Sequence, residues 1–144
     1  MSGIYTQNIP IHIGAKASAD GTIAIATATI VLNSTNVAGF AEEWDTNGWF
    51  NPANGQFTPL IQGYYRMRVN LEADQLAASG TVNLRKGGVT VVSDSAPVLG
   101  SSAYPGRTAD FYCNGSTDYL DATLTGDAAW RILHVDISFS FLGT

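Results

Sequence analysis

Hydrophobic and polar residues alternate with a period of two along most of the chain, a pattern typical of β-strands that bury one face. Between residues 64 and 71, apolar side chains on one face alternate with Arg66, Arg68 and Asn70 on the other. The run near the C-terminus is the clearest, and its apolar residues are predicted to share one face: Leu133, Val135, Ile137, Phe139 and Phe141. A slip of one residue would turn them all to the polar side, so the register of this strand is strongly specified.

Turn signals separate these runs. Asn-Gly and Gly-Gly pairs supply the positive φ angles that tight hairpins need, so Gly87-Gly88 predicts a hairpin over residues 86–89. Residues 71–79 have the composition of a helical turn, which is too short to be stable alone. Residues 93–107, rich in Ser, Gly and Pro, are predicted to form a long surface loop.

Short strands at intervals of about 8–12 residues predict an all-β fold of roughly eight to ten strands, as an antiparallel sandwich, barrel or jelly roll. The composition shows no break and no repeat, which indicates one domain over residues 21–144 preceded by an extended arm over residues 1–20. The arm carries apolar residues that suit strand addition to an exposed edge of a neighbouring protein: Ile4, Tyr5, Ile9, Ile11 and Ile13.

Charge is scarce, since Asp, Glu, Lys and Arg make up 13% of the chain against about 25% in an ordinary soluble protein. Twelve acidic and seven basic residues give a net charge of −5. The bases are scattered, which argues against a nucleic-acid partner, and no run approaches the roughly 18 apolar residues of a membrane span. A free monomer normally keeps its surface charged, so this composition favours a protein whose surface is largely covered by partners.

Reactive side chains are few. Cys113 is the only cysteine, and no activating group flanks it, so we expect a buried, inert thiol. His12 and His134 lie on polar faces of strands without the spacing of a metal or acid–base site. No hydrolase, P-loop or dinucleotide motif is present, so an enzyme is not expected. The first residues lack the features of a signal peptide, and we expect the chain to be made in a cytoplasm and not to be secreted by the general route.

Five motifs, in this order, resemble the C1q-like branch of the C1q/TNF jelly-roll superfamily. Asn54–Thr58 and Gly63–Met67 are similar to the Phe-Thr and Gly-x-Tyr-x-Phe elements that open a central strand in that family. Leu84–Gly88 is similar to its Leu-x-Lys-Asn-Gly hairpin, and Leu124–Asp127 is similar to its Leu-x-x-Gly-Asp element. Ser138–Leu142 is similar to its terminal Phe-x-Gly-Phe-Leu strand.

The resemblance implies an antiparallel jelly-roll sandwich that assembles as a homotrimer and serves as a binding or structural head. Some members of the superfamily bind calcium near the trimer apex, and the corresponding weak candidates in this chain are Asp118, Asp121 and Asp127. Because no spaced ligand loop is present, solvated carboxylates are expected there, and neither a metal nor a cofactor is predicted.

The inward-facing apolar residues are predicted to pack either the sandwich core or the trimer axis, two alternatives that the pattern does not separate. They are Tyr65, Met67, Val69, Trp130, Val135, Ile137, Phe139 and Phe141. The hydroxyl of Tyr65 needs a buried partner in either case. Trp44 and Trp49 are also expected in packing, whereas a ligand-binding loop is expected at Tyr104, Arg107 and Asp118.

In phages, small trimeric jelly rolls of this kind resemble capsid decoration proteins and the knobs of fibres. The predicted function is therefore a trimeric decoration or cement protein on the virion surface, bound to the major capsid protein through the N-terminal arm. The alternative is a fibre knob that binds a receptor or a cell-surface glycan, and a third hypothesis is a soluble trimeric head for a small ligand. At a three-fold seam, Arg66 and Arg68 would need carboxylates from a neighbour: Glu72, Asp110 or Asp136.

Overall fold

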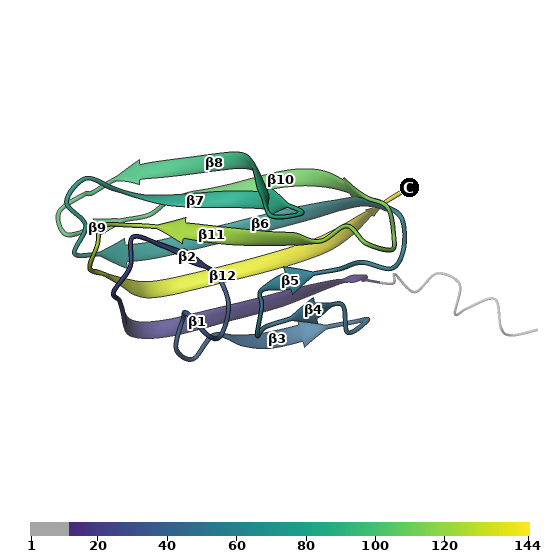
Figure 1. Cartoon of the computed structure of the whole chain (residues 1–144), viewed down its shortest axis with the longest axis horizontal. Coiled ribbons are helices and arrows are strands. Elements are labelled where there is room, and N and C mark those ends of the chain that lie inside the picture. Colours follow the sequence, from purple (N-terminus) through teal and green to yellow (C-terminus); the bar gives the residue numbers. More distant parts are fainter. Residues whose placement is uncertain (1–11) are drawn as a thin grey trace, which may run out of the picture.

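The computed structural model describes residues 12–144, and within them every regular element is a β-strand (Figure 1). The strands are β1 (Gly14–Ile25), β2 (Thr29–Val31), β3 (Ala41–Asp45), β4 (Phe50–Asn51), β5 (Gln56–Phe57), β6 (Gly63–Asp74), β7 (Ser79–Lys86), β8 (Val89–Pro97), β9 (Ser102–Ala103), β10 (Gly106–Cys113), β11 (Leu120–Thr125) and β12 (Trp130–Gly143). Sheet A has the order β10-β6-β12-β1-β3, with β9 beside β6. Sheet B has the order β4-β5-β11-β7-β8, with β2 beside β11.

All strand pairs in both sheets are antiparallel, so the predicted all-β antiparallel sandwich is confirmed. The described residues hold more strands than the spacing predicted, because β2, β4, β5 and β9 have only two or three residues each. Strands that short leave no alternation to detect. The predicted hairpin at residues 86–89 is confirmed, since Lys86 pairs with Val89 and both intervening glycines have positive φ.

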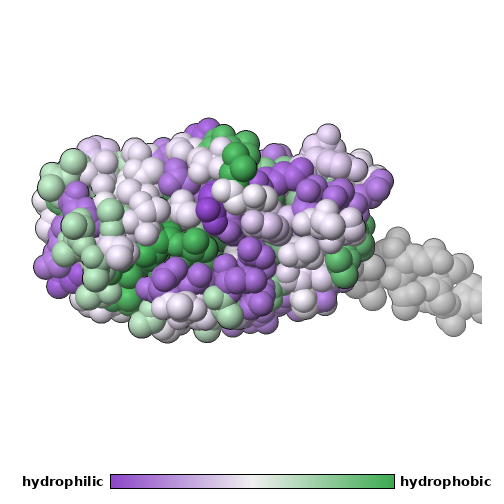
Figure 2. Space-filling view, in the orientation of Figure 1, coloured by the Kyte–Doolittle hydropathy of each residue, from purple (hydrophilic) through white to green (hydrophobic). Residues whose placement is uncertain are grey.

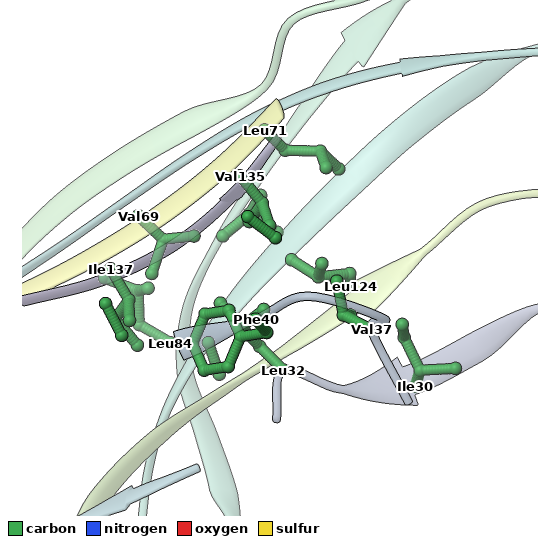
Figure 3. Close-up of a cluster of buried hydrophobic side chains, with 14 of the residues drawn as sticks. Ile30, Leu32, Val37, Phe40, Val69, Leu71, Leu84, Leu124, Val135 and Ile137 are labelled. Carbon is green, nitrogen blue, oxygen red and sulfur yellow. The ribbon is translucent and has the colours of Figure 1, made fainter. Parts of the chain in front are cut away.

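The core lies between the sheets and is filled by alternate side chains of the long strands. In Figure 3, Val69 and Ile137 of sheet A face Leu84 and Leu124 of sheet B. The structure places in this core most of the residues predicted to pack the sandwich or the trimer axis: Tyr65, Met67, Val69, Trp130, Val135, Ile137 and Phe139. Phe141 is half-buried against it. The seven buried side chains therefore pack the core of a single chain.

One side chain of the C-terminal strand departs from the predicted face. The pairing of β12 with β6 shifts register between Ile132 and His134, and this bulge turns Ile132 into the core. Leu133 is therefore only partly buried, and the prediction that it joins Val135 on the inner face was wrong. A bulge adds one residue to a strand, which reverses the alternation on one side of it.

The segments predicted as a helical turn and as a long loop both contain strand residues. The helical turn over residues 71–79 is absent, because β6 continues to Asp74 and the chain then turns at Gln75, which has φ of 61°. The loop predicted over residues 93–107 is occupied by the second half of β8, by β9 and by the start of β10. β8 is an edge strand with small polar residues, and such a strand lacks the apolar alternation that marks a buried one.

The first strand begins earlier than predicted. Residues 14–20 pair with β12 on one side, and part of the same segment pairs with β3 on the other. They therefore belong to the sandwich, and the predicted domain boundary at residue 20 was wrong. The inward residues Ala15, Ala17 and Ala19 are buried, but alanine is too small to give a clear hydrophobic pattern. Of the predicted arm residues, Ile4, Tyr5, Ile9 and Ile11 lie outside the described residues, and the carbonyl of Ile13 accepts a hydrogen bond from Phe141 N–H at 2.8 Å.

Replacing Gly63 with alanine is expected to lower the free energy of unfolding by about 2 kcal/mol. Gly63 has φ of +149°, and a Cβ there would lie 2.6 Å from the carbonyl oxygen of Gly143 and 2.7 Å from Phe141 Cε1. Urea denaturation measures the loss. Gly39→Ala is the matched control: Gly39 also has positive φ, at +78°, but no atom lies within 4 Å of its Cβ position. An equal loss in both variants would contradict the steric part of this account.

Candidate interaction surface

The outer face of sheet A is polar and combines charged and amide side chains with serines and a glycine. The alternation that buries one side of β6 and β12 turns Arg66, Arg68 and Asn70 outward, opposite Ser140, Ser138 and Asp136. β1 continues the face with Gly14, Lys16 and Ser18. Small residues leave the backbone of these strands open to close approach by another surface.

Exposed aromatic side chains gather at one end of this face. Tyr64 of β6 pairs with Tyr112 of β10, and their rings pack edge to face with centroids 5.5 Å apart. Leu142, at the bulge of β12 opposite Tyr64, is exposed beside them. We call these three residues the tyrosine patch. Lys86 borders it, since its Nζ lies 6.0 Å from the Tyr112 ring centroid and donates to the Tyr112 carbonyl at 2.6 Å.

A second exposed apolar area lies at the start of β8, the edge strand of sheet B. Val89 and Val91 are both more than half exposed, and Thr90 between them is exposed as well. In Figure 2, hydrophobic surface appears at the upper edge of the molecule over β8. The second half of β8 is held to sheet A, because the carboxylate of Asp94 accepts the Gly106 N–H of β10 at 3.0 Å.

Most cations of the chain are paired within it, namely Lys16, Arg66, Arg85, Lys86 and Arg131. Arg66 donates to both carboxylate oxygens of Asp110 on β10, at 2.9 and 3.1 Å. These hydrogen bonds raise the pKa of Arg66 and lower that of Asp110. Arg66 therefore has its carboxylate partner within its own chain, and that partner is one of the three carboxylates named from the sequence. Arg68 and Arg107 form no ion pair with any residue in the described part of the chain.

The three calcium candidates do not converge. Asp121 is 2% exposed on β11 and binds Arg85 of β7 through both oxygens. Asp118 lies 3.1 Å from Lys86 Nζ, and Asp127 accepts the N–H of Ala77. Each carboxylate thus serves a separate local contact. No group of three or more His, Cys, Asp or Glu side chains among residues 12–144 is placed to hold a metal ion.

The three residues predicted to form a ligand-binding loop do not lie together either. Tyr104 is exposed just before β10 and Arg107 is exposed at its start, whereas Asp118 follows its end. Because β10 has eight residues at about 3.3 Å each, these groups lie at opposite ends of the sandwich. The tryptophans differ too: Trp130 is buried and Trp49 packs edge to face on Phe57, but Trp44 is 42% exposed on the edge strand β3.

Two further groups are enclosed in the fold. The hydroxyl of Tyr65 donates to the carbonyl of Ile61 at 2.7 Å, which supplies the buried partner that the sequence required, and burial raises the pKa of Tyr65 to about 12. Cys113 is fully buried, and burial raises the pKa of its thiol to about 11. The thiol is therefore protonated at neutral pH and shielded from reagents.

Residues 12–144 enclose no ligand-sized pocket. The same residues contain no helix with the length and apolar character needed to cross a membrane. The exposed areas described above are the tyrosine patch, the start of β8 and the polar outer face of sheet A.

No protein-family model matches the sequence, and no curated protein matches it. Among solved structures, the globular domain of zebrafish complement 1qA protein aligns with a TM-score of 0.68 at 13% identity, covering 90% of this chain and 96% of that one. Murine APRIL aligns with a TM-score of 0.69 at 8% identity, covering 92% and 100%. The fold is a C1q/TNF-like jelly roll.

This jelly roll also occurs in a virion protein. The vertex protein P5 of PRD1 aligns with a TM-score of 0.67 at 14% identity, covering 90% of this chain and 73% of that one. Identities this low show the fold alone. The fold that the motifs predicted is confirmed.

Proposed function

We propose that this chain is a homotrimeric structural protein of a phage virion that decorates the capsid surface and cements the shell. The observation that carries the proposal is a surface with exposed apolar side chains at the tyrosine patch and at the start of β8 and, over residues 12–144, no pocket. The jelly roll shared with the vertex protein P5 of PRD1 supports it at the level of fold. The role is adhesive and not enzymatic.

A closed ring of three identical chains needs two different surfaces that complement one another. The tyrosine patch and the start of β8 are the surfaces that we propose for this contact, and they belong to different sheets of one chain. Tyrosine is among the residue types that dominate interface energies. The low charge of the chain agrees with burial of such surfaces, since few ions would have to be desolvated.

The cement role follows from mass action. A protein that binds the assembled shell and not its free subunits stabilises the shell by an amount that grows with its own concentration. We propose the major capsid protein as the partner, with the N-terminal residues reaching neighbouring subunits and assembly taking place in the host cytoplasm. Particles that lack the protein should then lose integrity on heating or at low salt.

In solution, the chain is expected to have three times its monomer mass of 15.2 kDa at micromolar concentration. Replacing Tyr64 and Tyr112 with serine should shift the mass toward the monomer, because both rings are exposed in the single chain and their loss leaves its core intact. Light scattering measures the mass. Tyr104→Ser, an equally exposed tyrosine outside the patch, is the matched control and should remain trimeric. A 15.2-kDa wild-type species would contradict the proposal.

The alternative function is a fibre knob that binds a receptor or a glycan. Tyr104 favours it, because this side chain is 57% exposed and an exposed aromatic ring can stack on a sugar. Arg107 follows three residues later without an ion pair among residues 12–144. The copy number on particles separates the two functions: hundreds of copies indicate decoration, and about a dozen indicate fibres. Unchanged particle stability with impaired attachment to cells would favour the knob.

A further inference from the structure

His134 lies on the outer face of sheet A between two carboxylates. Its Nδ1 is 2.5 Å from Asp20 Oδ1 on β1, and its Nε2 is 2.8 Å from Asp136 Oδ2 on its own strand β12. Asp136 is held in place by the side-chain amide of Asn70 on β6, at 3.2 Å. The imidazole therefore adds a side-chain contact between β1 and β12, whose backbones are also paired.

This contact stands where the backbone ladders of β12 are interrupted on both sides. The pairing of β12 with β1 shifts register between Asp20 and Ile23, and its pairing with β6 shifts between Ile132 and His134. At such bulges the regular N–H to carbonyl bonds are locally disrupted. Side-chain contacts consequently carry more of the cohesion between these strands here than elsewhere in the sheet.

The two hydrogen bonds of His134 depend on whether its imidazole is protonated. A neutral imidazole has one N–H donor and one acceptor, whereas an imidazolium has donors at both nitrogens. Ionised carboxylates only accept. Both contacts of His134 are therefore satisfied together only when the ring is protonated. Accordingly, the hydrogen bond to Asp20 and then that to Asp136 raise the pKa of His134 above its ordinary value, against an opposing effect of burial.

Among the cations on these strands, only His134 lies within hydrogen-bond distance of both Asp20 and Asp136. The charged groups on the strands around it, besides Asp20 and Asp136, are Lys16, Glu42, Glu43, Asp45, Arg66, Arg68, Glu72, Asp74 and Arg131. Three of the four other cations are paired elsewhere, because Lys16 lies 2.9 Å from Glu43, Arg66 binds Asp110 and Arg131 binds Asp74. Arg68, which lies opposite Ser138, forms no ion pair with His134, Asp20 or Asp136. Glu72, the register partner of His134 on β6, adds further negative charge. Lys16 acts on Asp136 only at longer range.

We propose that His134 is a proton-operated clasp that fastens β1 to β12 and releases Asp20 when it loses its proton. Asp20 is the group released because its side chain is 78% exposed and water replaces the lost donor, whereas that of Asp136 is 19% exposed. The stabilising contribution is present in full below the ordinary pKa of 6.5 and is lost as the pH rises through the raised value. Every contact lies within one chain, so the clasp does not depend on trimer formation.

The test is an NMR titration of the His134 ring nitrogens in the full chain, with hydrogen exchange of the β1 amides at pH 6 and pH 8.5. The expected titration midpoint lies above 6.5, and the amides around Asp20 should show lower protection at pH 8.5, after correction for intrinsic exchange rates. In His134→Gln and Asp20→Asn this pH-dependent loss of protection should disappear. A midpoint at or below 6.5 would overturn the proposal, as would an unchanged pH dependence in His134→Gln.

Two control variants test whether another titratable group causes the pH dependence. His12→Gln removes the other histidine, and Asp110→Asn removes a paired carboxylate from the same face of sheet A. Both should keep the pH dependence of the wild type. Loss of that dependence in either control would place the titrating group elsewhere and overturn the clasp. The wild-type midpoint requires no variant, so it decides the question even if a substituted chain does not fold.

Discussion

Replacing Phe139 with alanine is expected to lower the free energy of unfolding by about 4 kcal/mol. Phe139 of β12 is fully buried, and its ring stacks on Phe57 of β5 with centroids 4.4 Å apart and planes 6° apart. Phe50 of β4 packs against the same ring at 5.7 Å. The ring thus joins sheet A to the short strands of sheet B, and its removal leaves a cavity that the two sheets fill only partly.

Denaturation in urea measures this loss as a change in midpoint at constant slope. Ser140→Ala is the matched control, because Ser140 is the next residue of β12 and is exposed on the opposite face. Its effect should stay within about 0.5 kcal/mol. A Phe139→Ala variant as stable as the Ser140→Ala variant would mean that the aromatic stack does not hold the sheets together.

The same two strands show why part of the fold was predictable. β6 and β12 are buried on one face only, and their inward residues are large, so the period of two is visible in the sequence. Met67 and Ile137, for example, are fully buried where the alternation predicted them. β1 is equally central in sheet A, but its inward residues include Ala15 and Ala17, whose small side chains conceal the pattern. The alternation therefore reveals a strand in the sequence only when the side chains on its buried face are large.

Bulges and edges account for the other errors. Leu133 follows the alternation of its neighbours in the sequence, but a register shift next to it reverses the faces. β8 lies at an edge, and its residues are exposed or half-buried throughout, so Ser93 and Ser95 resemble loop residues. Both features depend on which strand lies alongside, and that information is absent from a local window of sequence.

The contacts on the candidate surface also depend on which strands lie side by side and in which register they pair. Tyr64 lies on the same face of β6 as Arg66 and Arg68, but its pairing with Tyr112 depends on β10 lying next to β6. The Arg66–Asp110 pair joins residues 44 positions apart in the chain, and the sequence offered Asp110 only as one of several candidate partners. For the same reason, the contact between His134 and Asp20, 114 positions apart, had no signal in the sequence beyond the polar faces of the two strands.

Replacing Arg85 with methionine is expected to lower the free energy of unfolding by about 3 kcal/mol. Arg85 of β7 donates to Asp121 of β11, with its Nε 2.8 Å from Oδ1. The side chains are 19% and 2% exposed, so the variant leaves a carboxylate buried without its counter-charge. That state costs more than the intact pair contributes, because the desolvation of Asp121 is no longer offset.

Two comparisons separate this cost from the loss of packing. The double variant Arg85→Met with Asp121→Leu should recover most of the lost stability, because an apolar pair of similar volume leaves no charge buried. Arg66→Met removes a partner from the exposed pair with Asp110, and solvent screens that interaction, so its effect should be far smaller. Chemical denaturation of the four proteins measures all three changes against the wild type. If the double variant is no more stable than Arg85→Met, the loss arises from the methylene packing of Arg85 and not from the stranded carboxylate of Asp121.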